Sequence, residues 1–250
     1  MDLSTFPPIA VVLGGLQSLV TTLGVLVEPV AGASAAALGV VLLTLLVRLV
    51  LVPVGVSQVR AEVARRRLAP AITDLNRRIT DPAARSKALM ALYASEKASP
   101  LAGCLPTLAQ APVLTAVYSL FAHSEIAGHA NALLTHTLGG AALGANLFAS
   151  LAVGLPAIWP YLVLLALLAL LAVVVETSRR ATLRFTGAVT VTTAAPGQEA
   201  LPGMAGMVRW LPFVSVLFAA FAPLAAALYL VTSAAWTLGE RAVLRRVLAG

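Results

Sequence analysis

Long apolar runs dominate the chain, and they predict five membrane-spanning helices. Each run approaches the roughly 20 residues that cross a bilayer as an α-helix. The predicted spans are residues 35–54, 105–122, 155–175, 207–222 and 223–238. The last two form one nearly continuous apolar run that is too long for a single crossing, and Pro223 at its middle predicts a tight helical hairpin.

Residues 9–27 are long and apolar enough for a further span, but their pattern favours a helix that lies in the membrane surface. Their apolar residues recur every three or four positions, as on one face of a helix. The opposite face gathers small and polar residues: Gly14, Gln17, Ser18, Thr21 and Thr22. We therefore expect residues 1–32 to form an extracytoplasmic segment with an interfacial amphipathic helix. A sixth span is the alternative, and it would place the N-terminus in the cytoplasm.

Residues 55–99 combine helical periodicity with many charges and predict a cytoplasmic helical hairpin. The first helix carries an apolar stripe of Val56, Val59, Val63, Ile72, Leu75 and Ile79. Asp81 as N-cap and Pro82 at the first helical position predict where the second helix begins. That helix has its own stripe of Leu89, Leu92 and Tyr93. Residues 177–206 predict a flexible cytoplasmic loop, because they contain a run of Thr, Ala, Gly and Pro without helical periodicity.

The amino-acid composition, taken together with this pattern, predicts the fold class. The chain of 250 residues is 60% hydrophobic and 11% charged, whereas a soluble domain is about half apolar and about a quarter charged. We expect an all-α membrane protein. The single cysteine, Cys104, excludes an intrachain disulfide. We find no phosphate-binding glycine loop and no GxSxG or HExxH motif, so we expect neither an enzyme nor a cofactor or metal.

The net charge of +7 is informative because of where the basic residues lie. They fill the predicted hairpin, flank the loop before the fourth span and recur after the fifth: Arg60, Arg65, Arg66, Arg67, Arg77, Arg78, Arg85, Lys87, Lys97, Arg179, Arg180, Arg184, Arg209, Arg241, Arg245 and Arg246. Cytoplasmic loops retain basic residues, which predicts an outside N-terminus and a cytoplasmic C-terminus. The hairpin arginines set this topology as solvated charges or contact anionic lipid headgroups or ribosomal RNA.

Arg48 is the most informative residue, because it lies inside the first predicted span with apolar residues on both sides. A central arginine costs about 2.5 to 3.5 kcal/mol on insertion scales, so such residues usually face a hydrated cavity or a charged partner. Glu176 and Glu240 both fall at the cytoplasmic ends of spans, which argues against an internal ion pair. The simpler alternative is that Arg48 reaches the cytoplasmic headgroups with its long side chain.

Polar residues in the other spans could join Arg48 in a hydrophilic groove. Thr44 lies four residues before it and therefore on the same helical face. The further candidates are Gln110, Thr115, Tyr229, Thr232, Ser233 and Trp236. Each one alone also fits ordinary helix packing or anchoring at the membrane interface.

Several of these segments resemble the YidC/Oxa/Alb membrane insertase family. The resemblance is carried by Leu89-Met90-Ala91-Leu92-Tyr93, Glu96-Lys97, Ser99-Pro100-Leu101-Ala102-Gly103-Cys104-Leu105-Pro106 and Gln110-Ala111-Pro112, with Arg48, Pro53, Ser57-Gln58, Leu228-Tyr229 and Arg245-Arg246 around them. The resemblance runs from about Ala33 to Arg246, within a predicted insertase core of residues 33–250. The family members that it resembles are the short bacterial form without a large periplasmic domain. The chain departs from the family at Ala222-Pro223-Leu224-Ala225 and at Ser233-Ala234.

The resemblance implies an insertase or chaperone for nascent membrane proteins in the bacterial plasma membrane, with a groove open to the cytoplasm and lipid. Arg48 matches the family's arginine, Thr44 the polar residue one turn before it, and Tyr229 the aromatic of the last helix. The hairpin, with Arg60, Arg65, Arg66, Arg67, Arg77 and Arg78, is expected to help recruit substrate. Expected partners are nascent membrane proteins, membrane lipids, the Sec translocon and the ribosome. The alternative from the residues alone is a small-anion transporter that binds its solute at Arg48.

Overall fold

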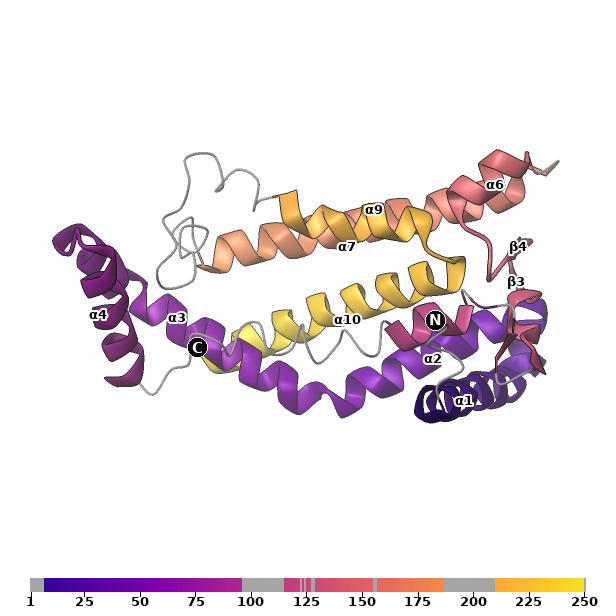
Figure 1. The fold of residues 1–250 in the computed structure, drawn as a ribbon, viewed down its shortest axis with the longest axis horizontal. Helices are drawn as coiled ribbons and strands as arrows, with labels where there is room; N and C mark the ends of the chain where they lie inside the picture. Colours follow the sequence, from indigo (N-terminus) through magenta and orange to yellow (C-terminus); the bar gives the residue numbers. More distant parts are fainter. Residues whose placement is uncertain are drawn as a thin grey trace. The chain divides into compact units, whose positions relative to one another are not determined.

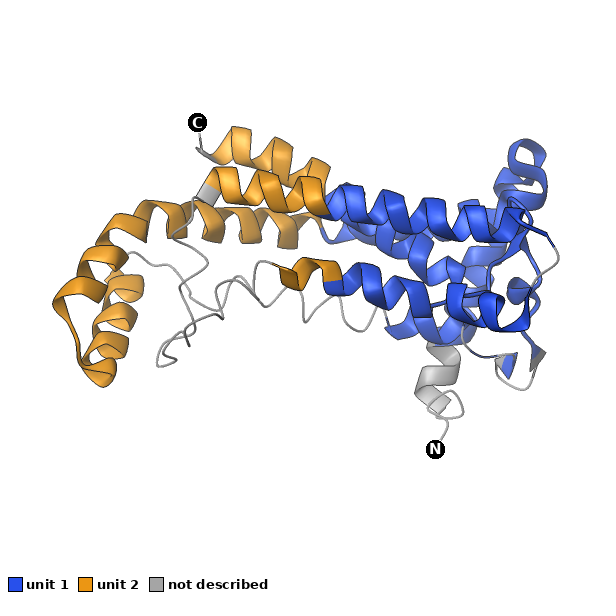
Figure 2. Cartoon of the chain, turned by 90° about the horizontal axis from the view of Figure 1, so that it is seen from above, with its two compact units in different colours: residues 1–51, 109–175, 214–237 blue, residues 52–108, 176–213, 238–250 orange. Residues whose placement is uncertain are grey.

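The computed structural model describes residues 7–95, 115–121, 123, 125–126, 129–154, 157–186 and 210–249, and these are mostly helical (Figure 1). The chain divides into two compact units, which we describe separately (Figure 2). Unit 1 consists of residues 1–51, 109–175 and 214–237, and unit 2 of residues 52–108, 176–213 and 238–250. Two long helices, α7 and α10, contribute residues to both units.

Unit 1 is a helical body with an irregular loop at one end. Its elements are α1 (Pro7–Ala31), the 3-10 turn η2 (Gly32–Ser34), α2 (Ala35–Val50), a helical segment at 115–121, α6 (Leu147–Val153), the first part of α7 (Trp159–Thr186), α9 (Val214–Phe221) and the first part of α10 (Leu224–Ala249). The 3-10 turn η6 (Leu211–Phe213), which precedes α9, belongs to unit 2. The core of the unit contains Leu13, Val40, Leu120, Leu164 and Leu224. Residues from four helices and the 115–121 segment therefore meet in one apolar cluster.

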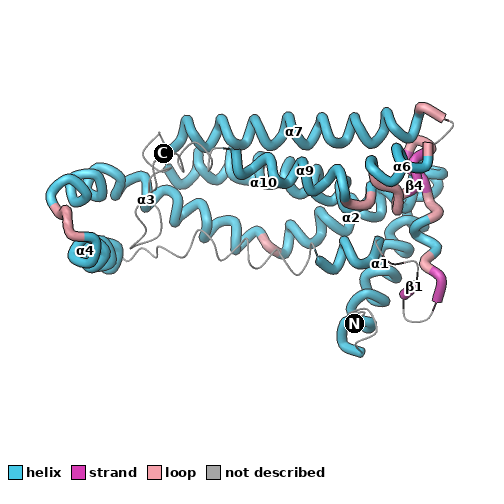
Figure 3. The backbone as a smooth tube through the Cα atoms, turned by 45° about the horizontal axis from the view of Figure 1, so that its top comes forward, coloured by secondary structure: helices cyan, strands magenta, loops and turns pink. Residues whose placement is uncertain are grey.

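Helices α1 and α2 pack at very short range because glycines face each other. A Cβ atom added to Gly39 would lie 2.7 Å from the carbonyl oxygen of Val20 and 3.2 Å from the amide nitrogen of Gly24. Leu13 and Val20 of α1 are fully buried, whereas Leu26 on the same helix is exposed. Figure 3 shows α1 inclined to α2 rather than continuing its direction. One face of the predicted amphipathic helix thus packs against the rest of unit 1, and another face is exposed.

The loop at residues 123–154 corrects the all-α expectation, because it contains two short antiparallel β-ladders. Strands β1 (Glu125–Ile126) and β2 (His129–Ala130) pair with each other, as do β3 (Thr137–Leu138) and β4 (Ala141–Ala142). The turn between β3 and β4 is Gly139-Gly140, with φ of 56° and 83°. Two consecutive positive φ values suit a two-residue hairpin, and glycine adopts them without strain. The Gly-Gly pair was a turn signal that the sequence analysis did not use.

The same loop holds the start of α10. The backbone amide of Leu224 donates to the carbonyl oxygen of Ala145 at 2.7 Å, and that of Ala225 donates to Leu143 at 3.0 Å. The first amides of a helix have no hydrogen-bond acceptor inside the helix. Here two carbonyl oxygens of the loop serve as acceptors for two of these amides. Chain segments about 80 residues apart are therefore joined at the beginning of α10.

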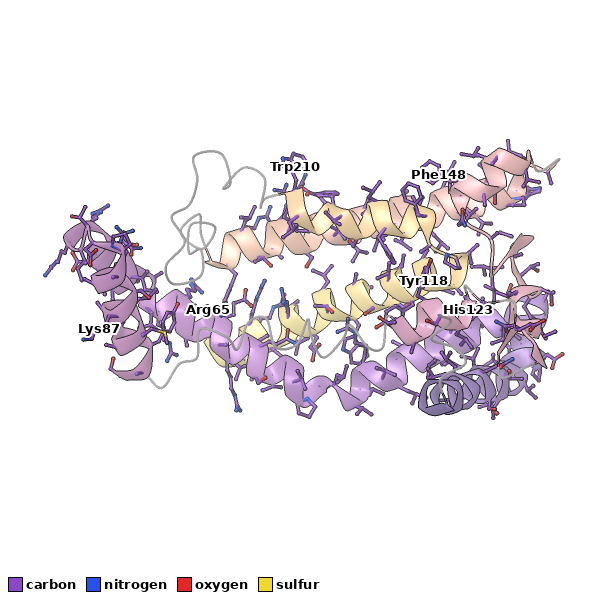
Figure 4. All side chains as sticks on the ribbon, in the orientation of Figure 1. Arg65, Lys87, Tyr118, His123, Phe148 and Trp210 are labelled. Atoms are coloured by element: carbon purple, nitrogen blue, oxygen red, sulfur yellow. The ribbon has the colours of Figure 1, made fainter. Side chains whose placement is uncertain are left out.

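The predicted turn at Pro223 is confirmed. Helix α9 ends at Phe221 and α10 begins at Leu224. Aromatic side chains pack α9 against its neighbours in unit 1. Phe221 stacks on Phe148 of α6 with ring centroids 4.2 Å apart, and Phe218 lies at 5.9 Å from Tyr118 (Figure 4).

Unit 2 contains the predicted helical hairpin, formed by α3 (Val52–Arg78) and α4 (Pro82–Ser95). Pro82 begins α4, and the amide of Ala84 donates to the Asp81 carboxylate at 2.7 Å, which confirms the predicted N-cap. Leu68 and Ile72 of α3 pack against Leu89 and Tyr93 of α4. The hairpin thus buries Ile72 of the first predicted stripe and Leu89 and Tyr93 of the second, together with Leu68, which the predicted stripe did not include.

Helix ends differ from the predicted span ends in three places. α2 ends at Val50 and α3 begins at Val52, so the break falls inside the predicted first span. α7 continues to Thr186 and α10 to Ala249, each about ten residues beyond the predicted end of its span. Charged residues in these extensions are compatible with helix, since Arg and Glu are good helix formers. A change in polarity marks where a helix leaves an apolar environment, not where it ends.

Two helical stretches in the described part of the chain are long and apolar enough to cross a membrane. They are Leu13–Val50, which includes α1 and α2, and Trp159–Phe185 in α7. Leu211–Phe221 is apolar but shorter. Of the predicted second span, the structure describes only residues 115–121. The count of five spans and the orientation of the termini therefore stay predictions.

Candidate functional site

Arg48 lies in the last turn of α2 and is half-buried within unit 1. Its Nε atom donates a hydrogen bond to the hydroxyl oxygen of Ser233 at 3.0 Å, and its Nη2 atom donates to the same oxygen. Two donors on one edge of the guanidinium thus share one acceptor. Because the guanidinium is planar and its donors are fixed in a fork, this contact determines how the whole group is oriented.

Ser233 comes from α10 and is only 2% exposed. A hydroxyl oxygen has two lone pairs, which is the number that the two Arg48 donors require. The next turn of α10 adds a further bond, because the Thr237 hydroxyl donates to the Ser233 carbonyl oxygen at 2.9 Å. The site therefore joins residues 185 positions apart through one buried side chain.

Thr44 and Tyr229, both predicted for the groove, lie in the packed interior of unit 1. Thr44 is 1% exposed, and its hydroxyl donates to the carbonyl oxygen of Val40 at 2.7 Å. Tyr229 is 3% exposed and belongs to the apolar core. The hydroxyl of Thr44 is thus satisfied by its own helix, a common arrangement for threonine in apolar helices.

Thr232 and Trp236 extend the polar positions along α10. The Thr232 hydroxyl donates to the carbonyl oxygen of Leu228 at 2.8 Å. The indole Nε1 of Trp236 is buried and has no hydrogen-bond acceptor within the described part of the chain. An indole N–H can only donate, so this position has a donor to offer to a bound group or to water.

The remaining two groove candidates do not add to this geometry. Thr115 is exposed at the start of the helical segment 115–121. Gln110 lies outside the described residues. The structure therefore brings Arg48 together with Ser233, while the placement of Gln110 stays a prediction.

Unit 2 holds a second cluster around an arginine, and the sequence analysis missed it. We call it the Phe185 cluster; its members are Glu62 and Arg66 of α3, Thr182 and Phe185 of α7, and Arg245 of α10. Arg245 pairs with the Glu62 carboxylate at 2.6 Å and donates to the Thr182 hydroxyl at 3.1 Å. Both Arg66 and Arg245 lie over the Phe185 ring, at 4.7 and 4.8 Å from its centroid. Three helices are therefore tied together by one aromatic ring and one ion pair.

A smaller charge group sits on α7 of the same unit. Glu176 accepts from Arg179 at 2.7 Å and from Arg180 at 2.5 Å. The guanidinium of Arg179 also lies 5.9 Å from the centroid of the Trp210 ring, which is labelled in Figure 4. These contacts satisfy charges near the end of a long apolar helix.

The hairpin arginines expected to recruit substrate are in several different settings, all on α3. Arg60, Arg67 and Arg77 are exposed, whereas Arg65 is half-buried. Arg66 belongs to the Phe185 cluster, and Arg78 pairs with Asp74 at 2.9 Å on the surface. Arg60, Arg67 and Arg77 are thus the best placed of the six for an external anionic partner.

Comparisons with known proteins give the context of this geometry. A family model described as "60Kd inner membrane protein" matches residues 27–249. Proteins named membrane protein insertase YidC are similar to this chain: 38% identical over 81 residues in Clostridium perfringens and 37% over 98 residues in Shewanella baltica. These alignments cover 32% and 39% of this chain, and 34% and 18% of the respective relatives. The chain thus spans about a third, at most, of the length of these curated relatives.

Proposed function

Because the chain belongs to the 60Kd inner membrane protein family, we propose that it is a membrane protein insertase. Its relatives from Clostridium and Shewanella carry that name, and the family match favours this function over a small-anion transporter. In the proposed reaction, a nascent membrane protein places its polar segment in a groove of unit 1 and releases its apolar segment into lipid. The reaction makes and breaks no covalent bond, so we propose no catalytic residue.

Arg48 is the observation that carries this proposal. A cation inside an apolar helical body attracts an acidic segment, because the attraction between charges is stronger where the dielectric constant is low. It also reduces the desolvation cost that a carboxylate meets on leaving water. The proposed groove keeps the residues that the sequence suggested together with Arg48: Thr44, Gln110, Thr115, Tyr229, Thr232, Ser233 and Trp236.

The proposed setting is the bacterial plasma membrane, with five spans, an outside N-terminus and a cytoplasmic C-terminus. In this arrangement residues 1–32 carry the interfacial helix and residues 33–250 form the insertase core. The cytoplasmic loop predicted at residues 177–206 loses residues 177–186, which belong to α7. The distribution of basic residues supports the orientation. The exposed apolar side chains Leu26 and Val30 of α1 support its contact with the lipid interface.

The proposed partners are nascent membrane proteins, membrane lipids, the Sec translocon and the ribosome. The α3–α4 hairpin would first meet the substrate, with Arg60, Arg67 and Arg77 as its exposed charges. Attraction at such exposed residues is screened by salt over about 8 Å at physiological ionic strength. This recruitment step should therefore weaken at high salt.

Insertion into proteoliposomes tests the proposal. Vesicles that contain only this protein should insert a single-span substrate with an acidic tail, and protease protection of the tail measures the yield. Arg48→Ala should lower the yield at least about tenfold, which corresponds to about 1.4 kcal/mol. Arg184→Ala is the matched control, because Arg184 is an exposed arginine in the last turn of α7.

One result would contradict the insertase function, and another would contradict only the role of the Arg48 charge. Wild-type vesicles that insert no more substrate than protein-free vesicles would contradict the insertase function. Equal insertion by Arg48→Ala and wild type would contradict the role of the charge but leave the insertase function in place.

A further inference from the structure

We infer that Ser233 is a positioning residue for Arg48, and not itself a contact for the substrate. The inference rests on the proposed insertase function and refines one part of it. Ser233 was a groove candidate from the sequence, but the structure buries it to 2% exposure and points its oxygen at Arg48. A side chain so covered acts on the substrate through the guanidinium that it holds.

The contact fixes both the place and the plane of the guanidinium. Nε and Nη2 lie on one edge of the group, and both donate to the Ser233 oxygen. An arginine side chain without such a contact has several rotatable bonds and loses considerable entropy when a ligand immobilises it. Ser233 thus orders Arg48 before an acidic segment arrives, which lowers the cost of binding.

The acceptor is also uncharged, and this distinguishes the contact of Arg48 from that of Arg245. Arg245 is held by the carboxylate of Glu62. A carboxylate at position 233 would orient Arg48 equally well, but it would add a negative charge beside the place where an acidic segment must bind. A hydroxyl supplies orientation and adds no net charge.

The surroundings keep Ser233 itself in place. It lies in the middle of α10, one turn before Thr237, whose hydroxyl bonds to the Ser233 carbonyl oxygen. Its neighbour Val231 and the core residue Tyr229 are likewise buried. Removing the hydroxyl by Ser233→Ala adds no atoms to this packing, so the variant should fold.

The test compares three substitutions at position 233 in proteoliposomes that contain the full chain. The substrates form a series with no, one or two acidic residues in the translocated tail. Ser233→Ala should lower insertion of the two-acid substrate about fivefold, the effect of losing one net hydrogen bond, and leave the uncharged tail unaffected. Ser233→Thr keeps the hydroxyl and should restore insertion. Ser233→Asp should reduce acidic-tail insertion as strongly as Arg48→Ala.

The control is Thr237→Val, which removes a hydroxyl from the same helix that bonds to backbone and not to Arg48. It should keep the wild-type dependence on tail charge. Equal loss for acidic and uncharged tails in Ser233→Ala would indicate a merely structural residue and overturn the inference. Wild-type insertion by both Ser233→Ala and Ser233→Asp, with Arg48→Ala still impaired, would also overturn it. Failure of wild type on every tail would instead refute the insertase function.

Discussion

Arg48 in unit 1 and Arg245 in unit 2 are both partly buried, but they are held in opposite ways. Arg48 donates to the hydroxyl of a serine, whereas Arg245 meets a carboxylate, a threonine hydroxyl and the face of a phenylalanine ring. The Arg245–Glu62 pair is 10% and 17% exposed. In these contacts Arg48 is oriented by an uncharged hydroxyl, whereas Arg245 is paired with the Glu62 carboxylate.

Under the proposed function, the contrast separates an arginine that binds substrate from an arginine that stabilises the fold. Removing one partner of a buried ion pair strongly destabilises the folded protein, because the other charge stays buried without a partner. A cation inside an apolar helix is costly from the start, so its removal should stabilise the protein while it weakens function. The same substitution should therefore have opposite effects on stability in the two units.

The largest expected effect is at Arg245. Arg245→Leu should lower the free energy of unfolding by about 3 kcal/mol, because Glu62 is left with a buried, unpaired carboxylate. Unfolding in mixed detergent micelles measures the change. Arg78→Leu is the control, since the Arg78–Asp74 pair is 76% and 55% exposed and should contribute about 0.5 kcal/mol or less. A loss at Arg245 no larger than the loss at Arg78 would contradict a structural role for the Phe185 cluster.

The second effect has the opposite sign. Arg48→Leu should raise the free energy of unfolding in the same micelles by about 2 kcal/mol, because the cost of a cation in an apolar helix is removed. Insertion of acidic-tailed substrates should fall at the same time. Arg48→Lys keeps the charge without the fork of donors and should show little gain in stability. If Arg48→Leu instead destabilises the protein, Arg48 resembles Arg245 and the contrast fails.

The smallest effect concerns the ring in the Phe185 cluster. Phe185→Leu keeps an apolar side chain but removes the aromatic ring that Arg66 and Arg245 contact. Loss of these cation–π contacts should cost about 1 kcal/mol, measured by the same unfolding assay. Phe185→Tyr keeps the ring and should cost less. The double variant of Phe185→Leu and Arg245→Leu should lose less stability than the sum of the two single losses, because both substitutions remove the same contact between Arg245 and the Phe185 ring.

Local features of the hairpin could be predicted from the sequence because their physics is local. The Asp81 N-cap and the Pro82 start depend on residues within one turn, and the turn at Pro223 follows from a residue that cannot continue a helix. The stripes that contain Leu89 and Tyr93 depend only on helical spacing. The structure has these elements at the residues where the sequence pattern predicted them.

Pairings between distant residues could not be predicted in this way. Nothing in the local pattern selects Ser233 over Thr232 as the acceptor for Arg48, or Glu62 as the partner of Arg245. Both contacts depend on how helices far apart in the chain pack. The buried position of Thr44 and the loop that caps α10 are of the same kind. The Gly139-Gly140 turn is the exception, since its sequence signal was present but unused.

The two hydrogen bonds that the amides of Leu224 and Ala225 donate to Ala145 and Leu143 hold the start of α10 in place. Ser233 lies nine residues from Leu224, which is about 14 Å along the helix axis. A tilt of about 5° around this point would move Ser233 by only about 1 Å, whereas residues near Ala249 would move about three times as far. A tilt of α10 about its start would therefore displace Ser233 far less than the end of the helix, which the Arg245–Glu62 ion pair ties to α3.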